Sequence, residues 1–155
     1  GINIYLEYKN FDLTMFWQGV QGVDIISDLK KETDLWSGLN IGFLNKGKRV
    51  LDAWSPANPG SDIPALARND SNNEKRVSTY YVENGSFLKL RNLQVGYNVP
   101  KAWAEKIRME RLRFYLSAQN LLTIKSKDFT GVDPENVNYG YPIPLNITFG
   151  VNVSF

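Results

Sequence analysis

The chain has 155 residues, 43% of them hydrophobic, with 18 basic and 16 acidic residues and a net charge of +2. It contains neither cysteine nor histidine, which excludes disulfides, thiolate nucleophiles, Ser-His-Asp triads and the usual zinc sites. Its charges are scattered, so no surface for nucleic acid is predicted, and no apolar run reaches the roughly 18 to 20 residues of a membrane-spanning helix.

The first 22 residues predict a β-hairpin. Apolar and polar residues alternate over about 1–8 and again over about 11–22, and only Lys9 and Asn10 separate the two runs. Alternation with period two is typical of a strand with one apolar face, and a two-residue connection is typical of a tight hairpin. Because the chain opens in strand phase, without an initiator Met or a signal peptide, we expect it to be the C-terminal piece of a longer protein.

Residues 23–85 predict a long loop, which contains several prolines and a polar run over 68–76. Aromatic side chains in this loop and in the later loop 123–143 could stack on sugar rings or on peptide side chains, but they could equally pack the loops together. These candidate substrate-binding residues are Trp54, Tyr80, Tyr81, Tyr139 and Tyr141.

The next segment predicts a strand over about 86–99, whose alternation changes phase near Arg91. Such a change indicates a β-bulge or a stretch that lies above the membrane. Residues 100–109 begin with Pro100 and are rich in helix formers, so we expect a short helical turn. Within it, Trp103 and Ile107 are four residues apart and should share a face, where we expect them to pack locally.

The last part of the chain predicts strands at about 110–122 and 144–155, joined by the loop 123–143. Asp133 and Glu135 could suggest hydrolase chemistry, but two residues apart on an extended segment they point to opposite sides. Asp133-Pro134 is more typical of a turn, and no supporting groups are present, so we expect no enzyme, no cofactor and no metal site.

The five expected strands are joined by short, very long, medium and long connections in turn. Outer-membrane barrels alternate short periplasmic turns with long extracellular loops, and aromatic residues at the expected periplasmic ends would form an interfacial girdle. The fold class expected is therefore all-β, the C-terminal strands of a large antiparallel transmembrane barrel. Five strands cannot close a barrel, so the strands 2–8 and 144–155 should be open edges. The alternative is a soluble β-sandwich that binds carbohydrate, and a secreted hydrolase is more remote.

Six motifs, in order along the chain, resemble the SusC/RagA family of TonB-dependent outer-membrane transporters. The motifs are Tyr8-Lys-Asn-Phe-Asp-Leu-Thr-Met-Phe-Trp-Gln-Gly-Val20, Trp54-Ser-Pro-Ala-Asn-Pro59, the strand Gly85 to Pro100, Leu112-Arg-Phe-Tyr-Leu-Ser-Ala-Gln-Asn-Leu121, Gly131-Val-Asp-Pro-Glu135 with Tyr141-Pro-Ile-Pro144, and the terminal Phe149-Gly-Val-Asn-Val-Ser-Phe155. The resemblance covers nearly the whole chain, although the family more often has Arg close to Tyr141-Pro-Ile-Pro144.

This resemblance implies an importer of glycans or peptides in the outer membrane of a Gram-negative bacterium. It further implies a SusD-like surface lipoprotein as partner, a TonB complex that acts through an N-terminal plug absent from residues 1–155, the remaining strands of the same barrel, and outer-membrane lipid. Phe155 would be read as an assembly signal. Leu13, Met15, Leu93, Val95, Leu116, Val151 and Val153 should face lipid. The lumen should be lined by Asp12, Gln18, Gln94, Arg113, Tyr115 and Gln119, and Tyr115 could touch substrate there.

Overall fold

The computed structural model describes residues 1–35, 45–67, 70, 73–74, 76–137 and 141–155. These residues fall into two compact units: a sheet unit of 1–21, 86–125 and 143–155, and a loop unit of 22–85 and 126–142. Within the described residues, no helix is long and apolar enough to cross a membrane.

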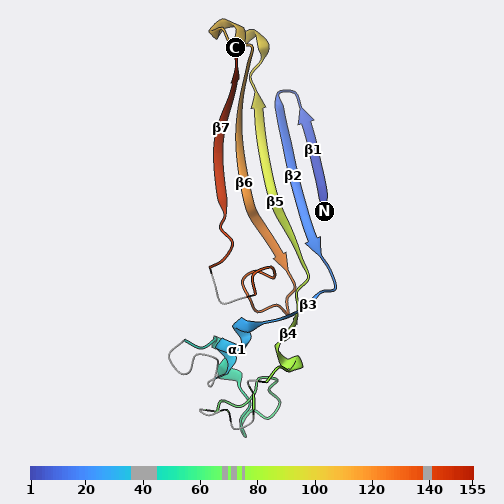
Figure 1. Ribbon diagram of the computed structural model, residues 1–155, viewed down its shortest axis with the longest axis vertical. Helices are drawn as coiled ribbons and strands as arrows, with labels where there is room; N and C mark the ends of the chain where they lie inside the picture. The colour runs from blue at the N-terminus through green and yellow to red at the C-terminus, as the bar shows by residue number, and fades with distance from the viewer. Residues whose placement is uncertain (36–44, 68–69, 71–72, 75, 138–140) are drawn as a thin grey trace. The chain divides into compact units, whose positions relative to one another are not determined.

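The sheet unit is a single antiparallel sheet of five strands (Figure 1). The strands are β1 (Ile2–Tyr8), β2 (Phe11–Val20), β5 (Phe87–Asn98), β6 (Arg111–Lys125) and β7 (Asn146–Ser154). They lie in the order β1-β2-β5-β6-β7, so β1 and β7 are the two edges, as the sequence predicts. The all-β fold class is confirmed, and the sheet does not close on itself.

The connections within this unit follow from local sequence. Lys9 adopts a left-handed φ of 56° in the tight turn that pairs Tyr8 with Phe11, which confirms the hairpin. After Pro100 the chain forms α2 (Lys101–Ala104) and then the 3₁₀ turn η3 (Glu105–Ile107), which ends at Arg108 with a left-handed φ of 59°. The expected helical turn is therefore present, between β5 and β6 (Figure 1).

Pairing between β5 and its neighbours shifts at Arg91. Asn92 pairs with Phe16 and Leu90 with Trp17, so Arg91 is the extra residue of β5 at this point of the ladder. Toward β6 the register skips from Asn92 opposite Gln119 to Leu90 opposite Leu122. The bulge predicted from the change of phase is confirmed.

The loop unit has structure that the sequence did not predict. Its elements are β3 (Asp24–Ile26), α1 (Asp28–Asp34), η1 (Lys48–Asp52), η2 (Thr79–Tyr81) and β4 (Val82–Asn84). β3 and β4 pair as a separate two-stranded sheet that joins the two ends of residues 23–85. Three-residue strands are too short to give a readable alternation, which explains why they were missed.

Candidate functional site

The pleat of the sheet separates an apolar face from a polar face. One row across all five strands is Leu6, Leu13, Val95, Leu116 and Phe149, each paired with the next. The next row is Glu7, Asp12, Gly96, Tyr115 and Gly150. Since side chains alternate between faces along each strand, the first row lies on the apolar face and the second on the polar face.

The apolar face is open over much of its area. Phe149 is 67% exposed and Leu116 is 51% exposed, and the rings of Phe114 and Phe149 stack with centroids 6.4 Å apart. Large exposed apolar patches are rare on soluble monomers and mark contact with another apolar phase or partner.

Polar side chains cross-link strands on the opposite face. Both Nε and a terminal nitrogen of Arg113 on β6 donate hydrogen bonds to the carboxylate of Asp12 on β2, the first at 3.1 Å. The Asn98 amide on β5 donates to the same carboxylate at 3.1 Å, and Arg111 donates to the Asn98 carbonyl at 3.4 Å. Asp12 is buried, and its carboxylate accepts hydrogen bonds from both Arg113 and Asn98, which offset the cost of burying its charge.

Glycine makes the Asp12–Arg113 contact possible, because β5 lies between the strands that carry the two residues. Gly96 pairs with Asp12 on β2 and with Tyr115 on β6, and a Cβ built on it would collide with the guanidinium of Arg113 and stand 2.5 Å from the carboxylate of Asp12. At the next strand a Cβ on Gly150 would strike the ring of Tyr115. The glycines are therefore depressions that larger side chains of neighbouring strands fill.

A second group of polar side chains lies at the bulge. Arg91 Nε donates to Gln18 on β2 at 2.9 Å, and its terminal nitrogen donates to Asn120 on β6 at 3.5 Å. Ser117 donates to Asn92 at 3.2 Å between the two groups. The polar face is thus tied across β2, β5 and β6 at several levels.

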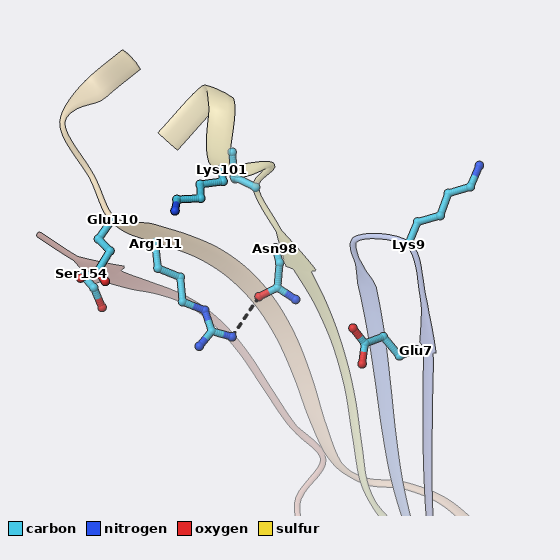
Figure 2. A pocket seen from close by; sticks show the side chains of 8 residues that line it. Glu7, Lys9, Asn98, Lys101, Glu110, Arg111 and Ser154 are labelled. Atoms are coloured by element: carbon cyan, nitrogen blue, oxygen red, sulfur yellow. Dashed lines mark hydrogen bonds between the residues drawn. The ribbon is translucent and has the colours of Figure 1, made fainter. Parts of the chain in front are cut away.

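The turn end of this face contains a shallow cavity (Figure 2). Its lining is mostly charged and consists of Glu7, Lys9, Asn98, Val99, Lys101, Glu110, Arg111 and Ser154. The Arg111–Asn98 hydrogen bond crosses it, whereas Lys9 extends away from the other labelled side chains (Figure 2). Both basic and acidic groups line this cavity, so it does not present a single sign of charge to a ligand.

The structure brings the six residues expected to line a lumen onto the polar face. Their register pairs or hydrogen bonds place Asp12, Gln18, Gln94, Arg113, Tyr115 and Gln119 there. Sequence reasoning missed Gly96, Asn98, Arg91 and Arg111, which complete the cross-links. The alternation predicts the face of Gly96, Asn98 and Arg111. It does not predict which side chains meet across an intervening strand.

The candidate loop aromatics differ in how far they are exposed. Trp54 is 44% exposed and Tyr141 is 96% exposed, so both can meet a ligand from solution. Tyr81 is only 1% exposed and donates its hydroxyl to the Glu74 carbonyl at 2.6 Å, which leaves it no surface for a ligand. Tyr80 is half-buried, and Tyr139 lies outside the described residues.

A buried polar cluster organises the loop unit. The Asp34 carboxylate, with no exposed side-chain surface, lies 3.0 Å from Arg49 and accepts a hydrogen bond from the Tyr80 hydroxyl at 2.8 Å. Lys30 donates to the Tyr80 carbonyl at 2.6 Å and lies 3.8 Å from Glu83. These contacts join α1 to η1, η2 and β4, so this part of the long loop has its own small core.

Burial in this cluster shifts three pKa values. Burial first, and the hydrogen bond to Asp34 second, raise the pKa of Tyr80 above its usual value. Burial, and then the negative charges of Glu74 and Asp70, raise the pKa of Tyr81 to about 12. Burial also lowers the pKa of Lys30.

Among the described residues, no three Asp or Glu side chains gather where a metal ion could be held. Asp133 caps a turn instead: the Glu135 amide donates to its carboxylate at 2.9 Å, and the Asn136 amide donates to its carbonyl at 3.0 Å. The expected Asp-Pro turn is confirmed.

The chain resembles known proteins along its whole length. No protein-family model matches. The chain is 36% identical to TonB-dependent receptor P3 of Formosa agariphila and 34% identical to TonB-dependent receptor P26 of the same organism, with all of this chain aligned in both cases. It spans 16% of the length of each of these relatives.

Solved structures give the same result. The chain superposes with a TM-score of 0.75 and 30% identity on the RagAB peptide importer in its closed-closed state, and with a TM-score of 0.73 and 28% identity on the open-open state. Each superposition covers 96% of this chain and 16% of the solved chain. The resemblance to the SusC/RagA family of TonB-dependent transporters is therefore confirmed.

Proposed function

We propose that this chain, which resembles SusC/RagA transporters along its whole length, forms part of the barrel wall of a TonB-dependent importer in a Gram-negative outer membrane. In this proposal residues 1–155 are the C-terminal barrel segment, and the plug belongs to another part of the protein. The apolar face meets lipid, and the cross-linked polar face lines the aqueous lumen.

The observation that carries this proposal is the apolar row that continues over five strands and stays open to its surroundings. Leu6, Val95, Leu116 and Phe149 in that row are all more than 40% exposed. A soluble sandwich would cover such a row with a second sheet. Within the described residues the only other sheet is β3–β4, which has two strands of three residues each, too small to cover it.

The cargo we propose is a glycan or a peptide, captured together with a SusD-like surface lipoprotein and released inward when the TonB complex acts on the plug. Similarity to a peptide importer supports the peptide alternative. Trp54, Tyr141, Tyr139 and Tyr80 in the loop unit, and Tyr115 on the sheet, are the proposed contacts. Tyr81 is omitted because it is buried. We propose no enzymatic activity.

The test uses the intact protein that carries this chain. We expect it in the outer-membrane fraction, extracted only by detergent, folded as a heat-modifiable band and co-purifying with a surface lipoprotein. Native mass spectrometry of the purified complex should then reveal bound oligosaccharide or peptide. Recovery in the buffer-soluble fraction would refute the membrane assignment, whereas a complex without either ligand would refute the cargo alone.

Within that complex, the combined change Trp54→Ala and Tyr141→Ala should reduce the retained cargo, because both rings are exposed in the loop unit. Tyr81→Phe is the matched control, since this ring is buried. Equal cargo in both variants would show that these loop aromatics do not contact it.

A further inference from the structure

The helical turn between β5 and β6 exposes two large apolar side chains. Trp103 is 64% exposed and Ile107 is 53% exposed, so more than half of the surface of each residue is open. The turn itself is anchored by Ala104, which is 1% exposed, and by the Met109 amide, which donates to the Ala104 carbonyl at 3.0 Å. Trp103 and Ile107 thus project from a fixed support.

Their direction follows from the helix. Lys101 lines the cavity on the polar face (Figure 2), and the Glu105 carboxylate lies 3.8 Å from the Lys101 ammonium. Each residue of a helix turns about 100°, so Trp103 lies about 200° from Lys101. Trp103 is therefore directed away from the polar-face cavity, and Ile107 follows it in η3.

The apolar face has an aromatic border at this same end of the sheet. Phe11 and Tyr97 pack with ring centroids 4.8 Å apart on paired strands, and Tyr8 is 70% exposed beside them. The β5 strand runs from Tyr97 directly into the turn. The turn that carries Trp103 and Ile107 therefore follows this border directly along the chain.

Basic residues flank the two apolar side chains. Lys106 and Arg108 are both exposed, on either side of Ile107. Aromatic and aliphatic side chains flanked by exposed cations are the composition of segments that lie in a membrane interface, where rings enter the headgroup region and cations meet anionic headgroups.

We propose that the α2–η3 turn is a membrane-interface anchor, with Trp103 and Ile107 inserted at the boundary of headgroups and acyl chains, and with Lys106 and Arg108 against anionic phospholipid headgroups. This inference rests on the proposed function, because it requires the apolar face of the sheet to meet lipid.

The experiment places a fluorescent label at one introduced cysteine in the intact protein, in a background without other cysteines. The three sites are Trp103→Cys for the anchor, Lys101→Cys for the opposite side of the turn, and Leu116→Cys for the apolar face of the sheet. The labelled proteins are reconstituted in phosphatidylcholine vesicles with or without phosphatidylglycerol. Nitroxide lipids with shallow or deep spin labels report lipid contact, and iodide reports water contact.

We expect the label at 103 to be quenched at least about twofold more by the shallow nitroxide than the label at 101, and to be shielded from iodide to a similar degree. The label at 116 should respond to the deep nitroxide. Phosphatidylglycerol should increase the shielding at 103, and the double change Lys106→Glu and Arg108→Glu should abolish that increase.

Equal iodide access at 103 and 101 would overturn the anchor. Shielding at 103 without quenching by either nitroxide lipid would also overturn it, because a protein segment would then cover the turn. No effect of phosphatidylglycerol would overturn the role of the two cations. Absence of lipid quenching at 116 would instead refute the proposed function, so the two failures are distinguishable.

Discussion

Gly96 determines which residues can meet on the polar face. Its missing side chain lets Arg113 reach across β5 to Asp12, two strands away. Removing one partner of an ion pair that is largely withdrawn from water strongly destabilises the folded state, because the other charge is left without a compensating charge. Gly96 therefore belongs to the site although it has no functional side chain, because its small size lets Arg113 and Asp12 meet.

The ion pair can be tested by a double-mutant cycle in the intact protein. Asp12→Asn and Arg113→Gln should each lower the unfolding free energy by about 1 to 3 kcal/mol, and the double change should cost clearly less than their sum. Heat-modifiability in a denaturant series gives the measurement. Glu7→Gln is the control. This exposed carboxylate lies on the same face, but the hydrogen bond described for it comes from Tyr5, and the salt bridge described for Arg113 is with Asp12. Additive losses would contradict the coupling.

Tyr81 gives a prediction of pH dependence in the loop unit. Its pKa is raised from about 10 to about 12 by burial, so the folded state holds the phenol proton more tightly than the unfolded state. The stability that this residue contributes is present below pH 10 and is lost as the pH rises toward 12, by up to about 3 kcal/mol. Tyrosinate absorbance in the native protein minus that in the Tyr81→Phe variant should rise near pH 12. A difference that rises near pH 10, as it does in urea, would show that Tyr81 is solvated.

At the scale of elements, strands whose alternation lasted seven residues or more were readable from sequence, and contacts formed by short elements were not. The phase change at Arg91 showed in the sequence because it shifts every later side chain to the other face. β3, β4 and the Asp34 cluster were missed, because buried charges such as Asp34 and Glu83 resemble solvated loop residues until a partner distant in sequence is known. Likewise, the sequence does not predict that Tyr80 and Tyr81 differ in burial, yet only Tyr81 is fully buried.

Strand β7 carries the sharpest test of the two faces. Val151→Arg puts a charge on the apolar face and should cost about 2 to 4 kcal/mol if that face meets lipid near the membrane midplane. Thr148→Arg, on the polar face of the same strand and paired with Ser117, should cost clearly less. Thr148 is a better control than Asn152, which lines a recess with Arg111 and Arg113 and would add a third cation there. Unfolding of the reconstituted intact protein measures both, and equal costs would refute the assignment of faces.

At the scale of the whole molecule, the sheet has five strands and two unpaired edges, β1 and β7. A barrel in hydrocarbon needs at least about eight strands, because each open edge leaves backbone N–H and C=O groups without partners. The chain also covers only 16% of the relatives it matches, which agrees with a wall segment whose edges pair with strands elsewhere in the protein.

Phe155 is the proposed assembly signal at the end of the β7 edge, and it is 88% exposed. Deleting it should lower the amount of heat-modifiable protein in the outer membrane, because the machinery that inserts barrels would no longer recognise the last strand. Molecules that do assemble should still transport. Phe155→Tyr keeps an aromatic ring and is expected to assemble normally. Unchanged assembly after the deletion would refute the role.

Gly96, beneath the Arg113 side chain, also helps to select the register in which the strands pair. If the register between two strands shifts by two residues, every side chain stays on the same face of the sheet. Burial of apolar side chains on one face therefore does not disfavour such a shift. In the observed register Arg113 pairs with Asn98 and reaches diagonally over Gly96, which pairs with Tyr115. A slip that pairs Gly96 with Ser117 would carry Arg113 two residues further from Asp12 and break the ion pair. The ion pair across Gly96 therefore favours the correct alignment of β2, β5 and β6 over this slip.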